Sequence, residues 1–132
     1  TSAGTQGVTR SVRAEQMLAA SFVVAGATVR YVGRLAPETV SFVITGQTSS
    51  AGGDEDLACA EYLEACLRGQ SPDAAPYLER VRHSRDAQQH FVPNQTLFPT
   101  SDIDLCTDLD RFNFAMPITR EDGRFVMRAI RP

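Results

Sequence analysis

Apolar residues along the chain alternate between runs of strand length and helical stripes. Residues 17–24 are an almost continuous apolar run, and residues 39–45 are rich in β-branched side chains between Pro37 and Gly46. Between these runs, the apolar positions of residues 25–35 recur at helical spacing. The order strand, helix, strand predicts a parallel crossover, because parallel strands are joined by a long connection that is usually helical.

The best-defined helix is predicted over residues 54–68. Its apolar side chains recur at helical spacing, and they are Cys59, Tyr62, Leu63, Cys66 and Leu67. Gly69 follows and is expected to end the helix. This spacing defines an inward face, and Asp56 projects from the same face in the first turn, with Asp54 and Glu55 flanking the helix N-terminus.

The other elements are predicted from capping residues and from alternation. We expect a loop that enters a polar helix over residues 4–16, and shorter helices over residues 71–82, 84–91 and 101–109. Residues 112–118 and 124–127 alternate as an antiparallel hairpin. The predicted fold class is α/β, a single domain over residues 1–132 with three α/β/α layers, a mostly parallel (mixed) sheet and a C-terminal antiparallel hairpin.

Composition and charge narrow the class of protein. A chain of 132 residues with 42% hydrophobic content can bury a core of its own. The net charge of −3 gives no broad basic surface, so we expect no nucleic-acid partner. No apolar run approaches the roughly 20 residues that a membrane span needs, so we expect no membrane partner. Without a basic and apolar leader, a cytoplasmic protein is expected.

The cysteines and the chain start carry two further expectations. Cys59, Cys66 and Cys106 have no CxxC spacing, so we interpret them as reduced core thiols.

The sequence opens at Thr1 inside a turn, with no strand before it. We therefore expect the C-terminal part of a longer protein, whose missing N-terminal half, or a separate upstream chain, is a partner. The open strand edge also predicts a homo-oligomer.

Three strand-to-helix turns are expected at one edge of the predicted sheet, within residues 1–7, 24–28 and 45–56. Ligands bind at this edge in open α/β sheets. Gly4 and Gly7 permit positive φ angles and a close backbone approach, so that N–H groups can surround an oxyanion. Ser2, Thr5 and Thr9 add hydroxyl groups, and Arg10 and Arg13 follow. An ordinary tight turn has the same composition.

The third turn carries three consecutive acids, Asp54, Glu55 and Asp56. Carboxylates in the first turn of a helix complement the helix dipole, and this explains them without a ligand. Carboxylate oxygens are also the ligands of hard cations. Next to a turn suited to phosphate, the acids indicate phosphate-ester chemistry.

Four segments resemble the carboxyl-terminal half of the 2-phosphosulfolactate phosphatase family, in the same order and at similar spacing. They are residues 1–5 (TSAGT), 17–25 (MLAASFVVA), 53–60 (GDEDLACA), and 102–106 (DIDLC) ahead of Met116-Pro117. The first resembles the family's TTNGT segment and the third its GxED segment. The family usually has Asn where Ala3 and Val24 stand, so polar contacts expected at both turns are absent.

This resemblance implies a Mg²⁺-dependent phosphatase that acts on 2-phospho-3-sulfolactate, a small phosphorylated substrate. Carried over by position, Ser2, Gly4 and Thr5 line the phosphate end together with Thr1, and Arg10 is a further candidate for substrate binding. Glu55 and Asp56 face the metal or its waters. Thr1, Glu55 and Asp56 are thus the candidate catalytic residues, and the nucleophile or base remains unassigned.

Two other functions fit the sequence. An N-terminal threonine is the nucleophile of self-processed amide hydrolases, and Thr1 fits that role if the chain is a cleavage product. A non-catalytic ligand-binding or assembly domain fits as well, because a fold does not fix a function.

Overall fold

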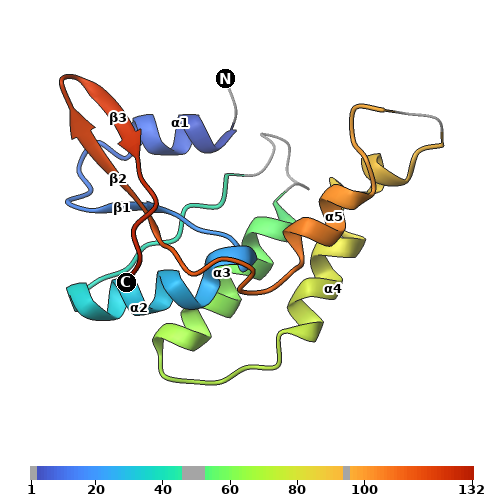
Figure 1. The fold of residues 1–132 in the computed structure, drawn as a ribbon, viewed down its shortest axis with the longest axis horizontal. Coiled ribbons are helices and arrows are strands. Elements are labelled where there is room, and N and C mark those ends of the chain that lie inside the picture. The colour runs from blue at the N-terminus through green and yellow to red at the C-terminus, as the bar shows by residue number, and fades with distance from the viewer. Residues whose placement is uncertain (1–2, 46–52, 94–95) are drawn as a thin grey trace.

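The computed structural model describes residues 3–45, 53–93 and 96–132. Its helices are α1 (Ala3–Arg10), α2 (Ala25–Leu35), α3 (Asp54–Leu67), α4 (Ala75–His83) and α5 (Ser101–Cys106), with 3-10 helices η1 (Phe22–Val24) and η2 (Ala87–Phe91). Its strands are β1 (Met17–Ala19), β2 (Met116–Glu121) and β3 (Arg124–Met127). Figure 1 shows α2, α3, α4 and α5 grouped together, with the small sheet and α1 on the opposite side.

The sheet is antiparallel, and its strand order is β1-β2-β3. Strand β1 pairs Met17 with Ile118, so residues from the two ends of the chain meet in one sheet. The turn between β2 and β3 has positive φ angles of 47° at Asp122 and 74° at Gly123. Such angles suit a tight hairpin, because they match the twist of the flanking strands. The predicted C-terminal hairpin is confirmed.

The core lies where α2, α3 and α4 meet below η1. Its buried residues are Phe22, Ala25, Ala58, Tyr62, Leu63 and Val81. The ring centroids of Phe22 and Tyr62 are 5.6 Å apart, and those of Tyr62 and Tyr77 are 5.5 Å apart. The inward face predicted for residues 54–68 is therefore the face that packs. All three cysteines are free thiols, and Cys59 and Cys66 border this core, as expected. Cys106 is exposed, so the prediction of a core thiol is wrong at that position.

The mostly parallel, three-layered sheet is not confirmed. Among the described residues all strand pairs are antiparallel, and residues 39–45 form no strand. The run at 17–24 is a strand only in its first part. Further along, the carbonyl groups of Phe22 and Val23 accept hydrogen bonds from the Asp110 and Phe112 N–H groups, at 3.1 and 2.9 Å. A loop thus satisfies the backbone that a parallel strand was expected to pair.

Several helix predictions hold with shifted boundaries, but the order predicted for residues 4–16 is wrong, because the helix comes first, as α1, and residues 11–16 are not helical. Residues 25–35 are helical as predicted, whereas the helices expected at 71–82 and 101–109 are shorter, as α4 and α5. The segment 84–91 contains a 3-10 helix. No helix in the described part of the chain has the length and apolar character to cross a membrane.

An ion pair across the hairpin predicts a pH dependence of stability. Hydrogen bonds from Arg128 first, and then from Thr119, lower the pKa of Glu121 to about 2. A lowered carboxyl pKa stabilises the fold above the usual value of 4.5, and this contribution is lost as the pH falls toward about 2. The melting temperature of the wild type should therefore be higher than that of Glu121→Gln near neutral pH. The difference between the two melting temperatures should disappear in acid. Substitution of the exposed Glu38 by Gln is the control, and an equal loss there would contradict the assignment.

Candidate functional site

A pocket of about 160 Å³ lies between the turn after β1 and the first turns of α3. It is lined by Ala20, Ser21, Phe22, Glu55, Asp56, Cys59, Val81 and Cys106. Two of the three sequence-predicted acids thus share a cavity with the end of β1. Ser21 and Cys59 were not predicted as site residues, because serine and cysteine in apolar runs carry no signal of a site.

Glu55 presents an unusual carboxylate to this pocket. Its Oε2 atom is buried and has no hydrogen-bond partner in the described part of the chain. Burial raises the pKa of Glu55, a hydrogen bond with its own backbone lowers it, and the charges of Asp56, Asp86 and Asp54 raise it further. A buried carboxylate oxygen without a donor is costly, so this position favours a proton or a cation.

Asp56 is held by a residue that the sequence did not single out. Its Oδ2 atom accepts hydrogen bonds from both the backbone N–H and the hydroxyl group of Thr45, each at 2.9 Å. Gly53, with φ of 96°, precedes the first turn of α3. Asp56 therefore joins the segment before residue 46 to the start of α3. Both hydrogen bonds from Thr45 go to Oδ2, and Oδ1 is the other oxygen of this carboxylate.

The first predicted turn is helical. Gly4 and Gly7 lie inside α1, and neither is among the glycines with positive φ, so the expected nest of N–H groups around an anion is wrong. A Cβ atom placed on Gly7 would lie 2.9 Å from Cγ2 of Thr45. Because Thr45 also binds Asp56, α1 and the start of α3 are neighbours through this one threonine. The first and third predicted turns therefore meet at Gly7 and Thr45, whereas a Cβ atom on Gly4 would have no atom within 4 Å.

The remaining predicted residues of the first turn are placed as follows. Thr1 and Ser2 lie outside the described residues, so the roles predicted for them, including Thr1 as an amide-hydrolase nucleophile, stay predictions. Thr5 lies in the first half of α1, whereas Arg10 is in its last turn. With a rise of about 1.5 Å per residue, Arg10 is roughly 9 Å along the axis from Gly4.

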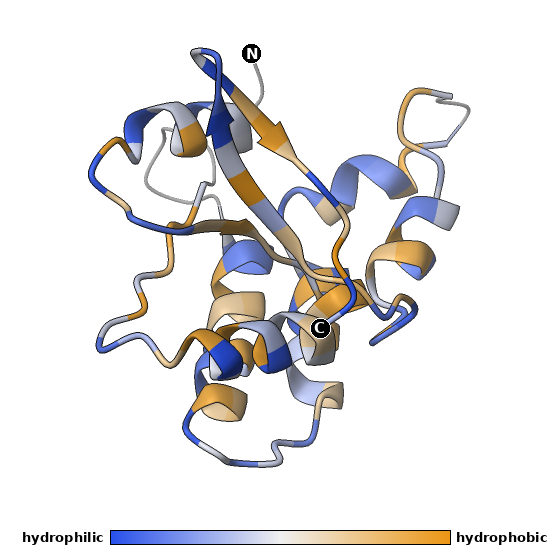
Figure 2. Ribbon diagram, turned by 60° about the vertical axis from the view of Figure 1, so that its left-hand side comes forward, coloured by the Kyte–Doolittle hydropathy of each residue, from blue (hydrophilic) through white to orange (hydrophobic). Residues whose placement is uncertain are grey.

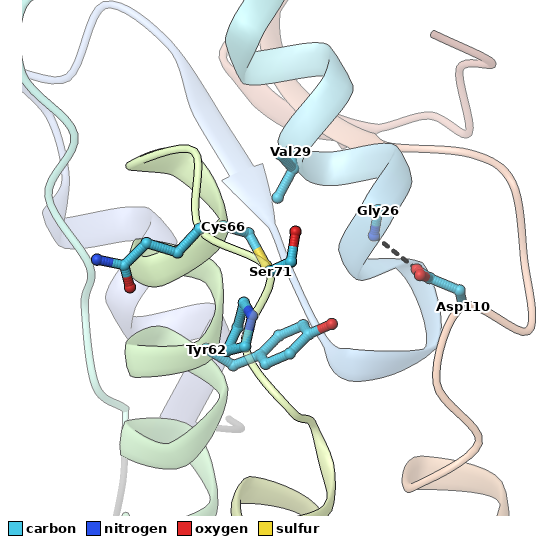
Figure 3. A pocket seen from close by; sticks show the side chains of 8 residues that line it. Gly26, Val29, Tyr62, Cys66, Ser71 and Asp110 are labelled. Atoms are coloured by element: carbon cyan, nitrogen blue, oxygen red, sulfur yellow. Dashed lines mark hydrogen bonds between the residues drawn. The ribbon is translucent and has the colours of Figure 1, made fainter.

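The second predicted turn does not join the Glu55 pocket. The N–H group of Gly26, at the start of α2, donates to Oδ1 of Asp110 at 2.6 Å (Figure 3). A Cβ on Gly26 would meet both carboxylate oxygens of Asp110, at 3.0 and 3.1 Å. The carboxylate of Asp110 thus lies at the N-terminus of α2. Gly26 and Asp110 line a separate pocket of about 270 Å³ that includes Tyr62 and Cys66.

The thiols near the Glu55 pocket are not nucleophiles. Burial, and then the charge of Asp56, raises the pKa of Cys59 to about 12. Burial and Asp102 raise the pKa of Cys106 as well. Both side chains are therefore protonated at neutral pH, and only a thiolate is reactive. The other polar side chains that line the pocket are those of Glu55, Asp56 and Ser21.

The described residues contain no group of three or more His, Cys, Asp or Glu side chains arranged to hold a metal ion. Glu55 and Asp56 provide two carboxylates at one pocket, and Asp54 is exposed. A Mg²⁺ ion often uses one or two carboxylates and completes its shell with water and substrate oxygens. The two carboxylates of Glu55 and Asp56 therefore match the number of protein ligands that Mg²⁺ often uses.

The raised pKa of Glu55 predicts a stabilising substitution. A carboxyl whose pKa is raised by folding stabilises the protein below its usual pKa of 4.5, and this contribution is lost as the pH rises through the raised value. Glu55→Gln removes the ionisation. In chelator, its melting temperature should exceed that of wild type at neutral pH, and the difference should vanish in acid below 4.5. A wild-type advantage at neutral pH would contradict this.

The contact between α1 and Thr45 predicts a second effect on stability. Alanine in place of an exposed helical glycine stabilises a protein by up to about 1 kcal/mol. Gly33 in α2 has open space around it, so Gly33→Ala should show this gain. The free energy of unfolding should change less favourably in Gly7→Ala than in Gly33→Ala, by about 1 kcal/mol or more, because the new methyl group at position 7 meets Thr45. Urea unfolding measures both, and equal gains would exclude the contact.

The chain is similar to known proteins over most of its length. The family model described as 2-phosphosulpholactate phosphatase matches residues 1–121. A protein of Bacillus subtilis (strain 168), named "Probable 2-phosphosulfolactate phosphatase", is 32% identical over 123 residues, which are 90% of this chain and 53% of that protein. The chain thus spans about half the length of this relative.

No solved structure matches the chain. The family match covers both halves of the site, from α1 to the start of α3, and continues into β2. On this evidence the chain belongs to the 2-phosphosulpholactate phosphatase family.

Proposed function

We propose that this chain carries part of the active site of a Mg²⁺-dependent phosphatase that acts on a small phosphorylated sulfocarboxylic acid, such as 2-phospho-3-sulfolactate. The observation that carries the proposal is the buried, unpartnered Oε2 atom of Glu55. It lies in a pocket beside Asp56, in a chain of a phosphatase family. A structural acid at a helix N-terminus would have a donor for this oxygen.

The carboxylates of Glu55 and Asp56 are the groups that would hold the ion. A bound Mg²⁺ polarises a phosphoryl oxygen and neutralises negative charge that develops on it. Electrostatics also favours an ion here, because two carboxylates would repel a phosphate dianion that approached the pocket alone. The substrate phosphate therefore needs a cation between it and the acids.

Thr45 and helix α1 would support this site, Thr45 by orienting Asp56 and α1 through its helix dipole. Thr45 holds Asp56 through two hydrogen bonds, so one carboxylate of the pair has a fixed orientation. Helix α1 packs against Thr45 through Gly7, and its N-terminal N–H groups, near Gly4 and Thr5, carry the positive end of the helix dipole. A phosphate that is bound near these groups gains hydrogen bonds without a large rearrangement. Thr1 and Ser2, which precede them in the sequence, would extend this end of the site.

The proposal is tested by phosphate release. The chain is co-expressed with the amino-terminal half implied by the family resemblance, and 2-phospho-3-sulfolactate and a generic phosphate ester are supplied with and without Mg²⁺. We expect Glu55→Gln to lower the rate by about 100-fold, since loss of metal-linked charge stabilisation costs roughly 3 kcal/mol. Isothermal titration should show weaker Mg²⁺ binding by the same variant.

A matched control lies on the same helix. Glu64 is an exposed acid near the end of α3, paired with Arg68 at 2.7 Å, and it lines neither pocket. Glu64→Gln makes the same chemical change and should leave the rate within about twofold, because exposed pairs contribute little. Phosphate release that is insensitive to Glu55→Gln, or to removal of Mg²⁺, would overturn the proposal.

A further inference from the structure

Residues 39–45 have the sequence of a strand but none of its partners. The segment is rich in β-branched residues, and it follows α2 as an irregular chain. In the described part of the structure no backbone hydrogen bond joins residues 37–44 to another backbone group. Figure 2 shows this stretch after α2 as a thin tube with hydrophobic residues along it.

The side chains of this segment already alternate between two directions. A Cβ on Gly7 would lie 2.9 Å from Cγ2 of Thr45 and 3.7 Å from Cγ1 of Val43, so these two side chains face α1. Residues two apart on one side are the signature of extended backbone. Phe42 and Ile44 belong to the other row, and they are 37% and 40% exposed.

An exposed apolar row with unpaired backbone is unfavourable in water. Val40, Phe42 and Ile44, two apart along the chain, are all among the exposed large hydrophobic residues, and Val43, in the row that faces α1, is exposed as well. Burial of the apolar surface that they still expose to water would be favourable. A neighbouring strand would satisfy the N–H and C=O groups and would bring side chains that cover the exposed row.

We propose that residues 39–45 form a β-strand that pairs with a strand from the rest of a family-length polypeptide, which lies outside this chain. The matched relative supplies the length for this partner, because the chain covers only 53% of it. A partner built from the other part of the same domain also fits the sequence pattern, since a strand that is apolar on both rows is covered on both faces of a sheet.

The pairing would act on the candidate site through Thr45. This residue ends the segment, and its N–H and hydroxyl groups both bind Asp56. A strand fixed over residues 39–45 would fix the position of Thr45, and therefore the orientation of one of the two carboxylates. The proposed pairing does not depend on which reaction the site performs.

Hydrogen exchange tests the pairing directly. The probe is the part of the Bacillus subtilis relative that lies outside the aligned region, co-expressed with this chain. We expect amides of residues 40–44 to exchange rapidly in the chain alone, and to slow by about tenfold or more in the co-purified complex. Unchanged exchange in the mixture, or a failure to associate, would overturn the proposal. Protection in the chain alone together with a dimer in light scattering would overturn it in favour of a second copy.

Proline variants provide a second measurement. Phe42→Pro and Val43→Pro remove one N–H group each, and adjacent N–H groups of a strand point to opposite sides. Because neither N–H is bonded to another backbone group among the described residues, the chain alone should keep its melting temperature. At one position at least, proline should weaken the association about tenfold more than alanine, which keeps the N–H group. Equal effects of proline and alanine at both positions would exclude strand pairing.

The two proposals fail in different ways. If phosphate release is insensitive to Glu55→Gln while the amides of residues 40–44 are protected in the complex, the proposed reaction fails and the pairing stands. Likewise, a complex that shows protection but releases no phosphate would support the pairing and would contradict the proposed reaction.

Discussion

Burial of one face of α3 is the constraint on which the rest of the structure depends. Ala58, Tyr62 and Leu63 are 0%, 8% and 2% exposed, and they hold η1, α2 and α4 together. Full burial of a side chain such as Leu63 stabilises the fold by roughly 2 kcal/mol. Glu55 lies three residues before Ala58 and seven before Tyr62, so helical geometry places it on the same face. The packing that forms the core therefore also buries the Glu55 carboxylate.

This coupling has an energetic consequence. A carboxylate oxygen without a donor lowers the stability of a fold, and a natural protein retains such a group when function requires it. Glu121 is the opposite case, because Arg128 and Thr119 satisfy its carboxylate on the surface. Both are glutamates in one small chain, and their pKa values shift in opposite directions, because burial dominates at Glu55 and hydrogen bonds from Arg128 and Thr119 dominate at Glu121. The buried Oε2 atom without a partner, and not its position at a helix N-terminus, is what makes Glu55 the stronger candidate for a site residue.

The elements that local patterns determine could be predicted from the sequence. Helix α3 has five apolar residues at helical spacing, and the hairpin has Asp122 and Gly123 at its turn, so both were predicted near their observed positions. The sheet could not be predicted in this way. Pairing of β1 with β2 joins residues about 100 positions apart, and no local pattern selects that partner over residues 39–45.

The candidate site also could be predicted only in part from the sequence. The acids of the third turn were visible because three carboxylates in a row are conspicuous, but their separate roles were not. Asp56 was expected on the inward face, yet Thr45 binds it, and it is Glu55 that keeps a buried oxygen without a donor. Asp110 likewise carries no signal in the sequence for its contact with Gly26, because 84 residues separate the two. Contacts of this kind depend on how elements pack, which the spacing of residue types along the chain does not determine.

Thr45 shows why the site and the unpaired segment belong to one physical argument. Thr45 ends an apolar run and binds an acid eleven residues later in the sequence. This contact forms only if the run itself is held in place. Helix α1 contacts the run through Gly7, a glycine that leaves room for the Thr45 methyl group. The packing of α3 positions the backbone of both Glu55 and Asp56, and two hydrogen bonds from Thr45 orient the Asp56 carboxylate in addition. The orientation of this carboxylate therefore depends on where the end of the run lies.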